Sequence, residues 1–152
     1  MSNRYPRKAT NARRPVETVT AATRALTARD SGSLFLLNRA AGQAITLPAI
    51  TGAEQGLEFE FYVLGSITSN TTTITAQSGD LLRGHVESID TDTSNAHAYY
   101  APDGTDDLIM TLNGSTQGGL VRTHVRFRAT DAGQWLVTGQ VMASGTPATP
   151  FS

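Results

Sequence analysis

Apolar and polar side chains alternate in two segments of the chain, residues 57–64 and 121–128. Every second residue of each segment is apolar or Thr, which places these residues on one face of an extended strand. The residues predicted to face inward are Leu57, Phe59, Phe61 and Val63 in the first segment and Val121, Thr123, Val125 and Phe127 in the second. One apolar and one polar face are typical of half-buried antiparallel strands, and we predict that both segments are strands of this kind.

The polar faces of these two segments carry opposite charges. Glu58 and Glu60 belong to the first segment, whereas Arg126 and Arg128 belong to the second. If the two strands are neighbours, the carboxylates lie opposite the guanidinium groups, and each exposed pair contributes roughly 0.2–1 kcal/mol to the register. We therefore predict that the strands pair, and we take these four residues as candidate contacts between protomers.

Shorter strands are expected between clusters of turn residues. They cover residues 33–38, 44–47, 71–76, 97–100 and 108–112, and a terminal hairpin joins residues 122–128 to residues 135–141. The Asp and Gly residues between the two arms of the hairpin supply the conformations that its turn requires. Trp135, Val137 and Val141 are expected to face the core.

This spacing of strands predicts an all-β fold, a β-sandwich or jelly roll with an extended N-terminal arm. We assign residues 23–143 to the body and residues 144–152 to an extended C-terminal tail that cannot add to a sheet. The single helical candidate is a short piece around residues 16–25, where Ala favours a helix and β-branched residues oppose it.

Charge is segregated along the chain, although the net charge is only −1. Residues 1–50 carry +6, residues 51–110 carry −9 and residues 111–152 carry +2. Five cations lie within the first fourteen residues, where there is almost nothing apolar to bury, so residues 1–22 are predicted to form a basic extended arm. The candidate contact residues of this arm are Arg4, Tyr5, Arg7, Lys8, Arg13 and Arg14.

The partner of the arm is predicted to be a protein surface rather than nucleic acid. The arm's cations are almost all arginines, whose planar guanidinium groups suit bidentate pairing with carboxylates. The rest of the chain is acidic and has no basic face interleaved with aromatic residues on which bases could stack. A solvated tail without a partner is the alternative interpretation.

The sequence shows no arrangement of residues that predicts catalysis or metal binding. It contains no Cys, its three His residues lack the spacing of a metal site, and there is no nucleophile elbow. The Asp-rich loop at residues 90–95 differs from a calcium-binding EF-hand, because Asn95 and Ala101 stand where Gly and Glu are required. We predict no enzyme activity, no cofactor, no metal and no small-molecule substrate. No apolar run is long enough to cross a bilayer, so no membrane partner is predicted.

Several segments, taken in order, resemble the capsid decoration (cement) proteins of tailed bacteriophages. They are residues 26–27, 30–32, 34–38, 41–42 and 45–48, followed by residues 56–61, 73–76 and 133–139. The resemblance implies a β-sandwich or jelly-roll body that assembles, commonly as a homotrimer, on the major capsid protein at the outside of a phage head. Such a virion protein is made in the cytoplasm of the bacterial host. The basic arm matches no motif of this family, so its role in capsid attachment is a separate inference.

Two other functions remain open at this point. A receptor-binding (adhesin) domain of a tail fibre or spike would present exposed aromatic residues, for which Tyr99 and Tyr100 are the only candidates. An enzyme such as a glycan hydrolase would need convergent carboxylates, and none is visible in the sequence.

Overall fold

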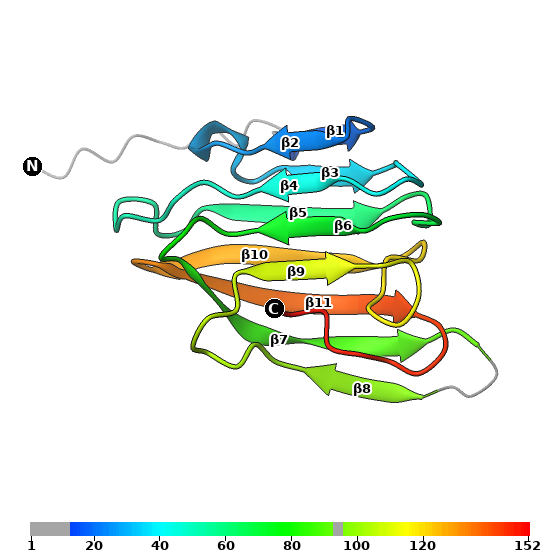
Figure 1. The fold of residues 1–152 in the computed structure, drawn as a ribbon. Coiled ribbons are helices and arrows are strands. Elements are labelled where there is room, and N and C mark those ends of the chain that lie inside the picture. Colours follow the sequence, from blue (N-terminus) through cyan, green and yellow to red (C-terminus); the bar gives the residue numbers. More distant parts are fainter. Residues whose placement is uncertain (1–12, 93–95) are drawn as a thin grey trace, which may run out of the picture.

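The computed structural model describes residues 13–92 and 96–152, which fold into two β-sheets packed face to face (Figure 1). The all-β sandwich predicted from the sequence is thereby confirmed. The larger sheet has the strand order β1-β3-β5-β10-β11-β7-β8. These strands are β1 (Val16–Val19), β3 (Leu34–Leu37), β5 (Glu58–Val63), β10 (His124–Asp131), β11 (Gln134–Ala143), β7 (Leu81–Asp90) and β8 (His97–Tyr100).

The smaller sheet has the order β2-β4-β6-β9. Its strands are β2 (Thr23–Ala25), β4 (Ala44–Thr46), β6 (Thr72–Thr75) and β9 (Ile109–Leu112). A single turn of 3-10 helix, Ala28–Asp30, follows β2. No helix in the described part of the chain is long and apolar enough to span a bilayer.

From β1 to β6 the chain alternates between the two sheets, with odd-numbered strands in the larger sheet and even-numbered strands in the smaller one. Strands that are neighbours within a sheet are therefore parallel here, as in β1–β3, β3–β5, β2–β4 and β4–β6. In Figure 1, β1, β3 and β5 follow one another along the larger sheet, and β2, β4 and β6 follow one another along the smaller sheet. Alternation along a strand reports which face is buried but not which strand lies beside it, so the sequence did not reveal these parallel pairs.

The predicted pairing of the two alternating segments is confirmed. β5 and β10 are antiparallel neighbours, with Glu58 opposite Arg128 and Glu60 opposite Arg126. The hairpin of β10 and β11 is also present. Val121 differs from the prediction, since 44% of it is exposed. It belongs to the turn that precedes β10 rather than to the strand.

Aromatic side chains fill the core between the sheets. Phe35 stacks on Phe61 with ring centroids 5.5 Å apart, and Phe61 meets Phe127 edge to face at 5.7 Å. Trp135 is fully buried, as predicted, and lies 5.7 Å from Phe59. Such contacts add to the stabilisation that comes from burying the rings themselves.

The ten-residue strand β7 was not predicted. Its inward positions are Leu82, Gly84, Val86, Ser88 and Asp90, so only two of the five are apolar. Gly84 has φ +93°, and a Cβ there would meet the carbonyl oxygen of Val137 at 2.2 Å. Close approach to β11 therefore requires a glycine, and this glycine interrupts the alternation that would identify the strand in the sequence.

Residues 16–25 correct two predictions. They form strands β1 and β2 instead of a short helix, and β1 lies inside the segment assigned to the arm. Val16, Thr18 and Val19 are β-branched, and they pair with the parallel neighbour β3. Among the described residues, the part of the arm that precedes the first strand is therefore limited to residues 13–15.

The C-terminal tail is also corrected, because it adds to the smaller sheet. Phe151 forms a bridge with Met110, and the Thr111 N–H donates to the Pro150 carbonyl. Phe151 is only 6% exposed and belongs to the core cluster. The tail thus covers the free edge of β9. Pro147 and Pro150 indicated that the segment would not pair, but Pro150 contributes a carbonyl acceptor, for which no N–H is needed.

Candidate interaction face

The outer face of the larger sheet brings together the predicted charged residues. The Glu58 carboxylate accepts hydrogen bonds from the guanidinium groups of Arg126 and Arg128, the latter through Nε at 3.0 Å and Nη2 at 2.6 Å. Arg126 therefore binds Glu58 diagonally, although Glu60 is the residue opposite it. Both arginines share one carboxylate because side chains on adjacent strands can reach the diagonal position.

Arg14 links the arm to this face. Its Nε donates to the Gly32 carbonyl at 3.0 Å, and its guanidinium group pairs with Glu60 and, at 3.4 Å, with Glu58. The contact joins residues more than forty positions apart, so no local pattern could have predicted it. Arg13 is exposed, and the arm residues Arg4, Tyr5, Arg7 and Lys8 lie outside the described residues.

Two opposing effects set the pKa of Glu58. Partial burial penalises the charged carboxylate, but hydrogen bonds from Arg126 and then Arg128 outweigh this penalty. The pKa of Glu58 is therefore lowered from its ordinary value. The charged carboxylate keeps the two arginines oriented.

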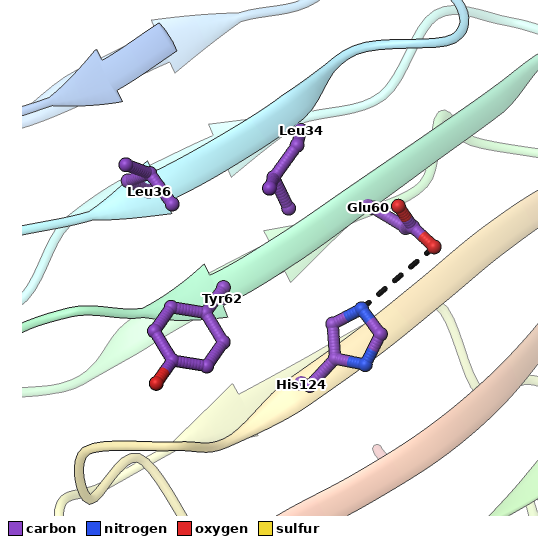
Figure 2. A pocket seen from close by; sticks show the side chains of 5 residues that line it. All are labelled: Leu34, Leu36, Glu60, Tyr62 and His124. Carbon is purple, nitrogen blue, oxygen red and sulfur yellow. Dashed lines mark ion pairs between the residues drawn. The ribbon is translucent and has the colours of Figure 1, made fainter. Parts of the chain in front are cut away.

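An apolar depression lies beside the charged residues on the same face (Figure 2). It has a volume of about 490 Å³ and is lined by Leu34, Leu36, Glu60, Tyr62 and His124. Nε2 of His124 lies 3.7 Å from Glu60. The leucines come from β3, whose residues 34–37 are apolar on both faces of the strand. Because an exposed sheet face is usually polar, two outward leucines are the sequence signal for this depression.

The apolar surface beside the depression continues to the edge of the sheet. Val16 is 59% exposed and pairs with Leu34, so these two residues form one row across β1 and β3. The arrangement offers an apolar surface bordered by Arg14, Glu60 and His124. Chemically it can accept an aliphatic or aromatic side chain of a partner while charged groups contact polar atoms around it.

A second ion cluster, not predicted from the sequence, closes the end of the core beside β1 and β2. The Arg24 guanidinium lies over the Phe35 ring at 5.8 Å and binds Glu17 through two contacts of 2.9 Å and Asp30 at 3.0 Å. The Arg24 hydrogen bond is the main cause that lowers the pKa of Glu17. Charged groups pointing inward at sheet edges oppose the addition of a further strand.

A second Asp-rich loop, at residues 103–107, has its carboxylates held by hydrogen bonds within its own turn. Asp107 accepts a hydrogen bond from the Asp103 N–H at 2.6 Å, and Asp103 accepts from both the N–H and the hydroxyl of Thr105 at 2.8 Å. Three carboxylates converge here, yet these contacts are those of ordinary Asx turns. The cluster is therefore a structural feature of the loop.

Comparisons with known protein families, with curated proteins and with solved structures find no match to this chain. The function of the chain is therefore inferred from its own sequence and from the geometry of this face.

Proposed function

We propose that this chain is a structural virion protein, a decoration (cement) protein that binds the outer surface of a tailed-phage capsid and stabilises it by bridging capsomers. Its partner is the major capsid protein, and the chain acts as a homotrimer. The ordered set of sequence segments supports this assignment. The observation that carries it is the contact of Arg14 with Glu58 and Glu60, because it places the part of the basic arm next to the body on the same face as the apolar depression.

The length of the basic arm and the repetition of copies suit a protein that bridges capsomers. Residues 1–12, when fully extended, span about 40 Å. Under this proposal the arm contacts a neighbouring capsomer while the body binds another. Individual exposed ion pairs are weak, but three linked copies bind together at a high effective concentration.

The arm is tested by deleting residues 2–12. The deletion ends there because Arg14 binds Glu60 and β1 begins at Val16, so the folded body keeps every described contact. We expect capsid occupancy in a co-sedimentation assay to fall at least about tenfold at equal protein concentration, since the arm supplies the cations for capsid carboxylates.

A variant of full length provides the control for this deletion. Arg4→Gln, Arg7→Gln and Lys8→Gln, introduced together, remove charge without shortening the chain. We expect this variant to lose most of the same occupancy. Undiminished binding by the deletion variant would remove the arm from the mechanism.

A receptor-binding domain of a tail fibre or spike is the second candidate, and one observation favours it. Tyr99 on the edge strand β8 is 72% exposed, whereas Tyr100 packs against the core. An exposed aromatic ring can stack on a sugar or on a partner side chain. Binding to host cells that is lost in Tyr99→Ala, with the protein on the tail, would support this function over capsid decoration.

A further inference from the structure

The turn before β10 holds an arginine in a conformation that favours glycine. The Thr123 N–H donates to the Leu120 carbonyl at 3.1 Å, and Arg122 has φ +80°. These are features of a type II turn with Arg122 at its third position, where Gly or Asn is preferred. Among the described residues, Asn70 is the only other non-glycine residue with positive φ, and Asn tolerates this region far better.

Hydrogen bonds fix the backbone of this turn from several sides. The Arg122 N–H donates to the Val63 carbonyl at 3.1 Å, and the Val121 N–H donates to the Ser66 hydroxyl at 2.9 Å. Thr123 is 1% exposed, and its hydroxyl accepts from the N–H groups of Gly119 and Met142. The fold therefore requires this conformation, and glycine would adopt it without strain.

The side chain of Arg122 makes no contact within the described residues that explains why arginine stands there. Arg122 is exposed, and no hydrogen bond or ion pair of its guanidinium group is present in residues 13–92 and 96–152. By contrast, Arg14, Arg126 and Arg128 all bind carboxylates of their own chain. A strained residue without a compensating contact indicates a role outside the folded chain.

Arg122 borders a hollow of about 320 Å³. The hollow is lined by Ser66, Thr91, Leu120, Val121, Arg122 and Met142. Its apolar side chains suit an aliphatic group, and the guanidinium group at its border suits a carboxylate. The hollow therefore suits a ligand in which a carboxylate lies next to an aliphatic group.

We propose that this hollow, the Arg122 pocket, binds a segment of a partner protein that presents a carboxylate next to an aliphatic side chain. The inference rests on the proposed function, under which the partner is the capsid. Arg14 contacts Glu58 at the start of β5, whereas the Arg122 N–H donates to the Val63 carbonyl at the end of β5. The body therefore has two attachment points, about 17 Å apart along one strand.

Arg122→Gly tests the pocket, because it removes the charge and relieves the strain together. We expect it to unfold thermally at the wild-type temperature or roughly 1–4 °C higher. Binding to capsids assembled from the major capsid protein of the same phage is expected to weaken about tenfold, the effect of losing one charge-assisted contact. Asn70→Gly is the matched control, since it changes the other residue with positive φ and leaves the pocket intact, so its binding should be unchanged.

The outcomes separate this inference from the proposed function. If wild-type protein does not bind capsids, the proposed function fails. If the wild type binds and Arg122→Gly binds equally well, the Arg122 pocket is not the contact and this inference alone is overturned. A melting temperature several degrees below wild type would also overturn it, because Arg122 would then be stabilising its own chain.

Discussion

Glu58 organises the charged face by accepting hydrogen bonds from two arginines of the adjacent strand and pairing more loosely with Arg14. Its side chain is 16% exposed, whereas those of Arg126 and Arg128 are 39% and 46% exposed. The carboxylate is thus the least hydrated member of the cluster. Solvent around the arginines screens the attraction and limits what each pair contributes.

Glu58→Gln should lower the free energy of unfolding by about 1 kcal/mol at pH 7, because the amide keeps the shape of the carboxylate but loses its charge. The pKa of Glu58 is lowered in the folded state, so its contribution is present above the ordinary glutamate pKa of about 4.3 and is lost as pH falls below it. Urea unfolding at several pH values should show wild type and variant converging on acidification.

Glu87→Gln is the control for this prediction. Glu87 lies on the same face, and among the described residues its ion-pair partner is His97 rather than an arginine. We expect a smaller loss of stability at pH 7. A gap between wild type and Glu58→Gln that persists unchanged well below pH 4 would contradict the assigned role of the carboxylate.

At the scale of residues, the sequence predicted the opposition of Glu58 and Glu60 to Arg126 and Arg128, because alternation and charge both specify a register. It did not predict that Glu58 accepts hydrogen bonds from both arginines, because this pattern depends on how far the side chains reach and not on their positions in the strands. The strain at Arg122 was also invisible, because only the folded turn shows that the residue must adopt positive φ.

At the scale of elements, the C-terminal tail is part of the folded body. Its last residues pair with β9, and Phe151 reaches the core between the sheets. The smaller sheet has four strands and the larger sheet has seven. The tail therefore helps to cover inward-facing residues of the larger sheet that the smaller sheet leaves uncovered. This makes the end of the chain a determinant of stability.

Phe151→Ala should therefore destabilise the protein by about 2–4 kcal/mol, slightly less than a fully buried phenylalanine because the side chain lies at the border of the core. Chemical denaturation measures the change. Ser152→Ala is the matched control: the hydrogen bonds of Ser152 use only its backbone, so stability should stay within about 0.5 kcal/mol of wild type. A neutral Phe151→Ala would show that the tail is not part of the core.

The elements that the sequence predicted are those with clear alternation or clear turn signals, such as β5, β10 and the hairpin to β11. β7 was missed because Gly84 and Ser88 occupy inward positions. β1 and β2 were missed because they are three or four residues long and lie next to a basic segment, so tertiary pairing rather than local preference decides their structure.

At the scale of the whole molecule, the edges of the smaller sheet are covered, whereas the outer face of the larger sheet is exposed. The Arg24 cluster closes the core at the first strand pair and the tail covers β9, whereas the face of the larger sheet presents an apolar depression beside exposed charges. Addition of a further strand at the β2 and β9 edges of the smaller sheet is disfavoured by this arrangement. Under the proposed function, copies of the chain associate through this face and the arm.

We propose that this body attaches to the outside of a phage head. Cryo-electron microscopy of intact virions, with the protein's density identified by its absence in particles lacking the chain, tests it most directly. We expect trimeric density on the outer capsid surface, with the basic arm crossing to a neighbouring capsomer. Density confined to the tail, or particles whose heads are unchanged without the chain, would contradict it.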